Sequence, residues 1–146
     1  SRRVLGYLLT CLPEHKAKVF IVATANAVHE LQPELLRKGR FDEIFFVDLP
    51  DAATRQQIFS LHLQRRDLDP AAFDLPSLAA ASEGFSGAEI EQAIVSALYD
   101  AAGGVGTLDQ ALLLHALATT RPLSVVMAER VQALRAWASG RCVPAD

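Results

Sequence analysis

Hydrophobic residues follow two different patterns along the chain, and the change falls near residue 50. Before it, short uninterrupted apolar runs at 19–24 and 43–47 predict buried strands of a mostly parallel sheet. A Leu-rich segment at 4–12 has one apolar helical face, and 33–37 suits a single helical turn. Two strands do not make an independent sheet, so residues 1–50 are expected to be an incomplete α/β fragment.

After residue 50 every readable pattern is helical. Three start signals are visible: Asp51 as an N-cap and two capping boxes, at 86–89 and 107–110. Glycines within 103–106 predict a flexible break. Helices are expected at 51–65, 75–81, 86–101, 107–118 and 124–138. We therefore expect an all-α bundle over 51–120, followed by a C-terminal helix and tail over 121–146.

Composition narrows the classes of function. The 146 residues carry a net charge of −3, which disfavours nucleic-acid binding through a basic surface, although Arg65 and Arg66 keep a DNA-binding reading open. No apolar run approaches the roughly 20 residues of a membrane span. Cys11 and Cys142 have no metal-ligand spacing, so no metal site is expected. None of the three lysines follows a glycine and precedes Ser or Thr, so a phosphate-binding G-x-x-x-x-G-K-[ST] loop is absent from the sequence.

Polar residues after the two expected strands and the turn between them could act on a phosphate. Asn26 directly follows the first apolar run, where an amide can orient a water or a phosphate oxygen, or simply form a turn. Arg37 and Arg40 lie three residues apart before the second run. Their guanidinium groups suit phosphate oxygens, but a salt bridge from Arg40 to Asp42 is the plainer alternative.

The helical part offers two further candidates. His62 lies one helical turn after Ile58 and could touch a ligand base or serve structure alone. Gly87 and Ala88 leave the start of the helix at 86–101 bare of large side chains, so that its N–H groups could approach a nucleotide. An ordinary helix start is the alternative.

Read in order, these segments resemble the C-terminal half of an AAA ATPase module. The resemblance rests on the strand ending in Thr24-Ala-Asn26, on the block Pro33-Glu-Leu-Leu-Arg-Lys-Gly-Arg-Phe-Asp42, and on Gly84-Phe-Ser-Gly-Ala-Glu89. It runs continuously to about residue 102. Within the family the chain is most similar to the uncharacterised AAA-like ATPases of cyanobacteria, plastid genomes and other bacteria. The fold it implies is an incomplete P-loop NTPase-like core followed by the AAA lid.

The resemblance assigns roles to the candidate residues. Asn26 aligns with sensor 1, and Arg37 and Arg40 align with the arginine fingers that act on a neighbouring subunit in trans. Ile58 and His62 align with adenosine-contacting positions of the lid, and Gly87 and Ala88 with the sensor 2 turn. The full-length protein is then expected to bind ATP and Mg²⁺, to form a ring, expected to be a hexamer, and to remodel an unknown macromolecule. Its expected place is the bacterial cytosol or the plastid stroma.

Departures from the family pattern limit this reading. The phosphate loop is missing, and so is the Asp-Glu pair that holds magnesium. Asp48 imitates that pair, but it lies after the arginine block and is followed by Leu49, so we assign it no catalytic role. We therefore predict that this chain alone hydrolyses no ATP and holds no tightly bound cofactor. The alternative is a non-catalytic helical interaction or regulatory module of AAA ancestry.

Overall fold

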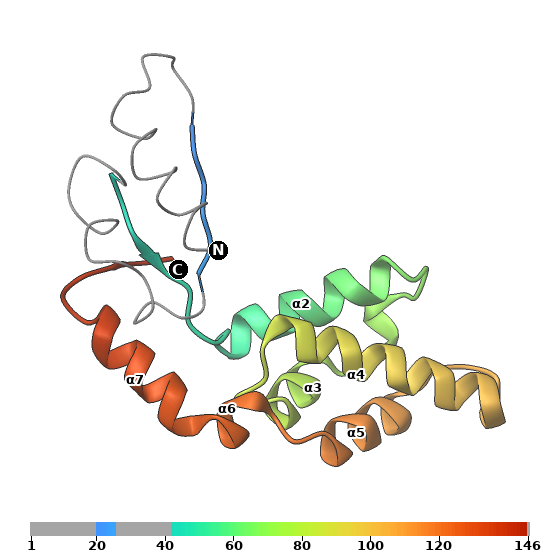
Figure 1. Cartoon of the computed structure of the whole chain (residues 1–146). Coiled ribbons are helices and arrows are strands. Elements are labelled where there is room, and N and C mark those ends of the chain that lie inside the picture. The colour runs from blue at the N-terminus through green and yellow to red at the C-terminus, as the bar shows by residue number, and fades with distance from the viewer. Residues whose placement is uncertain (1–19, 26–41, 146) are drawn as a thin grey trace, which may run out of the picture. The chain divides into compact units, whose positions relative to one another are not determined.

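The structure is a computed structural model that describes residues 20–25 and 42–145 (Figure 1). These residues belong to two compact units, which divide after residues 47 and 133. The first unit comprises the described residues up to 47 together with those from 134 onward, and the second comprises 48–133. The helix expected at 4–12 and the turn at 33–37 lie outside the described residues.

The first unit contains a small parallel sheet. Strand β1 (Phe45–Phe46) pairs with β2 (Val143–Pro144) in the register Phe45 to Val143. Two backbone bonds hold it, from Val143 N–H to the Ile44 carbonyl at 2.9 Å and from Ala145 N–H to the Phe46 carbonyl at 3.2 Å. Two parallel strands and a mainly helical remainder confirm the expected fold class.

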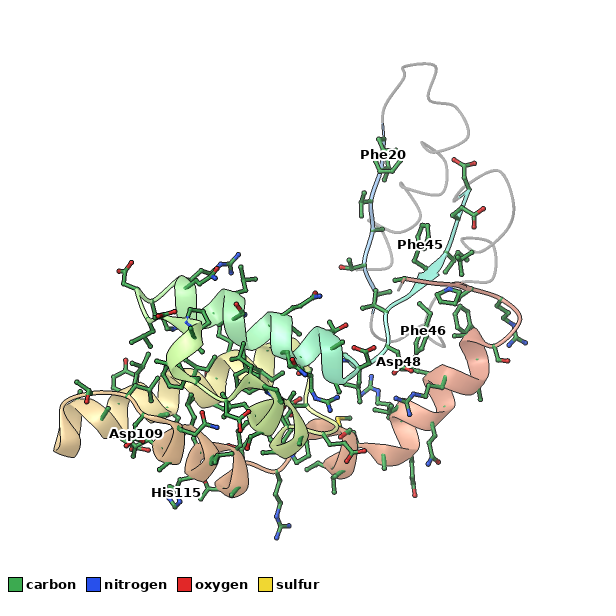
Figure 2. All side chains as sticks on the ribbon, turned by 180° about the vertical axis from the view of Figure 1, so that it is seen from behind. Phe20, Phe45, Phe46, Asp48, Asp109 and His115 are labelled. Carbon is green, nitrogen blue, oxygen red and sulfur yellow. The ribbon has the colours of Figure 1, made fainter. Side chains whose placement is uncertain are left out.

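The partner of β1 is nevertheless a different segment from the one that the apolar runs predict. Residues 20–25 form no regular strand, and Phe20 is 94% exposed (Figure 2). A strand exists only where a neighbour completes the hydrogen-bond ladder, and apolar composition alone cannot say which neighbour that is. Here the C-terminal segment supplies it, and Pro144 suits an edge strand because it has no N–H to donate.

The second unit is a helical bundle in which several helices begin after a residue whose side chain caps them. The helices are α2 (Ala52–Gln64), the 3₁₀ turn η3 (Pro70–Ala72), α3 (Leu75–Ala81), α4 (Gly87–Asp100), α5 (Gln110–Thr119) and α6 (Leu123–Val126), while α7 (Ala128–Ala138) continues into the first unit. The Asp51 carboxylate accepts from Thr54 N–H at 2.7 Å, which confirms the predicted N-cap of α2.

The core of this unit is built around α4, which packs against α2 and α5. Its fully buried large side chains are Phe59, Leu63, Leu78, Ile90, Ile94, Leu113 and Leu117. Burying each of them contributes roughly 1.5–3 kcal/mol. The buried Arg55 side chain binds the last turn of α3, because its Nε donates to the Ala79 carbonyl at 3.0 Å. Its Nη1 also donates to the Pro50 carbonyl at 2.7 Å. Cations are favoured at helix C-termini, where carbonyls lack partners.

Two expected helix boundaries between α4 and α5 are wrong. The glycine-rich stretch does not end the helical conformation, because α4 is followed directly by a π-helical turn, η4 (Ala101–Val105). This turn ends at Gly106, whose N–H donates to the Ala101 carbonyl at 2.7 Å. Helix α5 begins later than predicted, at Gln110. Asp109 caps it by accepting from Leu112 N–H at 2.8 Å, in place of the box expected from Thr107 (Figure 2).

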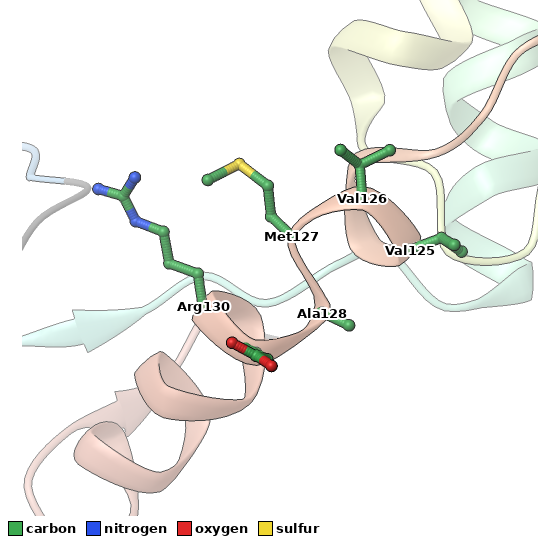
Figure 3. Close-up of a pocket in the computed structure, with 6 residues that line it drawn as sticks. Val125, Val126, Met127, Ala128 and Arg130 are labelled. Atoms are coloured by element: carbon green, nitrogen blue, oxygen red, sulfur yellow. The ribbon is translucent and has the colours of Figure 1, made fainter.

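The single helix expected at 124–138 is two helices that meet at Met127 (Figure 3). The Met127 carbonyl accepts from the N–H groups of Arg130 and Val131, so the hydrogen-bond ladder restarts there. Among the described residues no single helix is long and apolar enough to cross a membrane. Within that part of the chain, one pair of segments, Gln110–Val126 and Ala128–Ala138, is together long and apolar enough by length and composition alone, and it is bent by 54° at this break.

A close contact fixes Gly84 in the turn before α4. Its φ is +78°, and a Cβ added there would lie 2.5 Å from the Ser124 hydroxyl oxygen. We expect Gly84→Ala to lower the free energy of unfolding by about 1–2 kcal/mol, because alanine is strained in the left-handed region. Urea denaturation measures the loss, and Gly104→Ala is the control because its Cβ would meet open space. A Gly84→Ala chain as stable as the unaltered one contradicts this account.

Candidate functional site

The candidate residues of the helical unit lie where α2 approaches the start of α4. A Cβ added to Gly87 would lie 3.6 Å from the Cδ1 atom of Ile58, which is an ordinary van der Waals contact. The structure therefore brings together Ile58 and Gly87, which lie 29 positions apart by their residue numbers. His62 follows Ile58 by one turn of α2.

The start of α4 is held by the predicted capping box. The Ser86 Oγ accepts from Glu89 N–H at 3.4 Å, and a Glu89 carboxylate oxygen accepts from Ser86 N–H at 2.8 Å. Gly87 is half-buried and Ala88 is exposed. Gly87 and Ala88 place no large side chain on the first turn of α4, and their approach to a nucleotide stays a prediction.

His62 is nearly buried and belongs to a polar cluster that joins α2 to α4. Its Nδ1 lies 3.4 Å from Arg66 Nη1 and 3.4 Å from Glu91 Oε1. Arg66 donates from Nη1 to the His62 carbonyl and from Nη2 to Glu91 Oε1, both at 3.0 Å. The hydrogen bond from Arg66 holds the pKa of Glu91 below its ordinary value, with the positive charge of Arg66 adding to this effect and burial opposing it. Glu91 is therefore an ionised acceptor at neutral pH.

Other sequence candidates lie elsewhere or take local roles. Asn26, Arg37 and Arg40 lie outside the described residues, so their predicted roles stay predictions. Asp48 is exposed, and its carboxylate accepts from Leu49 N–H at 2.7 Å (Figure 2). Sequence reasoning did not find Glu91 or the role of Arg66. The spacing of four residues between His62 and Arg66 is a signal for the pair, but no spacing rule connects Arg66 to Glu91, which lies 25 residues further on.

Two other features of the described residues are weaker candidates for a functional site. A pocket of about 440 Å³ lies at the Met127 break and is lined by Val125, Val126, Met127, Ala128, Glu129 and Arg130 (Figure 3). Val125 and Val126 are 67% and 66% exposed, and the lining comes from one continuous segment. No group of three His, Cys, Asp or Glu within the described part of the chain could hold a metal ion. The α2–α4 contact is therefore the strongest candidate site.

Comparison with known proteins finds similarity to AAA proteins. Residues 1–49 match the ATPase family associated with various cellular activities (AAA). The chain is 42% identical over 140 residues to the AAA domain-containing protein ycf46 of Guillardia theta, and 43% identical over 139 residues to that of Pyropia yezoensis. These alignments cover 95% and 94% of the chain but 28% of each relative. A proteasome-activating nucleotidase of Saccharolobus islandicus is 43% identical over 81 residues, which is 56% of the chain and 20% of that protein.

Proposed function

The chain is homologous to AAA ATPases, and we propose that it is part of one that couples ATP binding and hydrolysis to remodelling of a macromolecule. The chain spans 28% of the length of the ycf46 relatives it matches. In this proposal the activity is that of a longer protein, called the whole protein below. The observation that carries the proposal is the approach of Gly87 to Ile58, with His62 one turn further along α2.

The helical unit acts in this proposal as the lid over the nucleotide. Ile58 offers an apolar surface and His62 a polar ring atom to the adenosine, while Gly87 and Ala88 let the start of α4 approach it. Three facts support this assignment: the contact of Ile58 with Gly87, the exposed Ala88, and the capped first turn of α4. Helix N-termini favour negatively charged groups, which suits a nucleotide.

Three residues outside the described part of the chain receive roles in this proposal from their match to the family motifs. Asn26 is sensor 1, which orients the attacking water. Arg37 and Arg40 are the arginine fingers, which stabilise charge on the transferred phosphoryl group of a neighbouring subunit. That role requires a neighbouring subunit, and a head-to-tail interface whose rotation closes forms a ring. We propose that the whole protein forms a hexamer in the bacterial cytosol or plastid stroma. The proposal assigns no magnesium ligand to the described residues.

ATP binding by the whole protein tests this proposal against the non-catalytic alternative. Titration with a labelled ATP analogue is expected to show binding that requires both the lid and the phosphate-binding residues that we place outside this chain. The isolated chain is expected to bind weakly or not at all. A whole protein that binds no nucleotide would favour the helical interaction or regulatory module.

The substitution Gly87→Ala separates a functional glycine from a structural one. Ala fits the free protein, because its Cβ would lie at an ordinary 3.6 Å from Ile58, so stability is expected to stay equal or rise by about 0.4–1 kcal/mol. ATP affinity of the whole protein is expected to fall by about tenfold, since the methyl group occupies the space of the nucleotide. Gly103→Ala is the matched control, with nothing within 4 Å of its Cβ. Unchanged affinity in Gly87→Ala would count against the lid assignment.

A further inference from the structure

The polar cluster of His62, Arg66 and Glu91 has a fixed order of donors and acceptors. Glu91 Oε1 accepts from Arg66 Nη2 at 3.0 Å, and this hydrogen bond is the main cause of the lowered pKa of Glu91. Arg66 Nη1 donates to the His62 carbonyl at 3.0 Å. Both ends of the guanidinium fork are therefore engaged, which orients Arg66 against the imidazole ring.

The orientation of Arg66 determines which nitrogen of His62 carries the proton. Arg66 Nη1 lies 3.4 Å from His62 Nδ1 with hydrogen-bond geometry. A guanidinium only donates, so Nδ1 must accept, and a neutral ring then carries its proton on Nε2. The competing arrangement has Nδ1–H donating to Glu91 Oε1, also 3.4 Å away. That approach is an ion-pair distance, whereas the contact with Arg66 also meets the angular requirement of a hydrogen bond.

Burial of His62 and Arg66 strengthens the preference for one tautomer of the His62 ring. The His62 side chain is 11% exposed and that of Arg66 is 21% exposed, so water competes little for the Nδ1 lone pair. Removing one partner of a buried hydrogen bond costs more free energy than the bond itself contributes, because the remaining partner stays buried without any hydrogen bond, to protein or to water. The cluster is therefore expected to hold one tautomer.

We propose that Arg66 and Glu91 are positioning residues that fix His62 as the Nε2–H tautomer, so that its free ring nitrogen is a hydrogen-bond donor. The proposal rests on the assignment of His62 to the nucleotide. It narrows the partner of the ring to an acceptor, namely an unprotonated purine nitrogen or a ribose oxygen. Neither Arg66 nor Glu91 needs to touch the ligand.

Nitrogen-15 NMR of the His62 ring in the 146-residue chain tests the proposal without nucleotide. At a pH well above the ordinary histidine pKa, we expect an unprotonated Nδ1 and a protonated Nε2. In Arg66→Met we expect the two signals to move toward each other as the tautomers mix, and in Glu91→Gln a smaller move in the same direction. Arg65→Met removes the same charge from an exposed neighbour and is expected to leave the ring signals unchanged.

A protonated Nδ1 in the unaltered chain, or an unaltered tautomer pattern in Arg66→Met, would overturn the proposal. If Arg66→Met fails to fold, Arg66→Lys retains the charge and the aliphatic stem but lacks the fork, and it is expected to mix the tautomers as well. In the whole protein, Arg66→Met is expected to weaken ATP binding by about three- to tenfold. A whole protein that binds no ATP would defeat the proposed function, whereas the ring signals would still decide the tautomer.

Discussion

Replacing Arg40 by alanine in the whole protein is expected to lower the rate of ATP hydrolysis by about 10³-fold, with little change in ATP affinity. In our proposal the guanidinium reaches the nucleotide of a neighbouring subunit, where negative charge develops on the phosphoryl oxygens as the bond breaks. A planar group with five donors and a permanent charge suits that position. The interaction is strongest in the transition state, so its loss lowers kcat more than it weakens binding. Steady-state hydrolysis and an ATP titration measure the two quantities.

Lys38→Ala is the matched control for Arg40→Ala, because it removes a positive charge within the same block. We expect it to change the hydrolysis rate only slightly. The trans arrangement adds a second expectation: mixing Arg40→Ala subunits into unaltered rings lowers activity, since each altered subunit disables a neighbouring site. If Arg40→Ala and Lys38→Ala have equal and small effects, Arg40 is not an arginine finger.

Replacing Phe59 by alanine is expected to lower the free energy of unfolding of the helical unit by about 3–5 kcal/mol. Phe59 is fully buried in the core formed by α2, α3, α4 and α5. Alanine would leave a cavity that the surrounding helices fill only in part. Domains of ordinary stability unfold at about 5–15 kcal/mol, so the change would remove a large share of the total. Urea denaturation followed by circular dichroism measures it.

Leu61→Ala gives the comparison for Phe59→Ala, because Leu61 lies on the same helix and is 44% exposed. Its substitution is expected to cost well under half as much, since less apolar area leaves contact with the core. Equal losses for the two substitutions would mean that the core does not lie where the structure places it.

The sequence predicted best where a local signal was enough. Asp51 and Ser86 are short polar residues directly before apolar periodic segments, and both cap the helices expected of them. Here the side-chain oxygen and the N–H that it accepts lie within three residues of each other, so local composition determines the contact. Asp109 shows the limit of such signals. Two possible caps, Thr107 and Asp109, lie close together, and the carboxylate is the one that the structure uses.

Features that depend on distant residues could not be predicted in the same way. Val143 and Pro144 pair with β1 across about a hundred residues, and two residues are too short a run to show a period. The break at Met127 interrupts a pattern that looks continuous, and no Gly or Pro marks it. In the candidate site, the motif indicated His62 and Gly87, but Glu91 reaches Arg66 and His62 from another helix.

Side-by-side ATPase assays of the 146-residue chain and the whole protein test the central claim most directly. The account predicts steady hydrolysis by the whole protein and none above background by the chain, because the chain has no phosphate-binding loop of the G-x-x-x-x-G-K-[ST] type. Measurable turnover by the purified chain that disappears in its Arg40→Ala variant would contradict it.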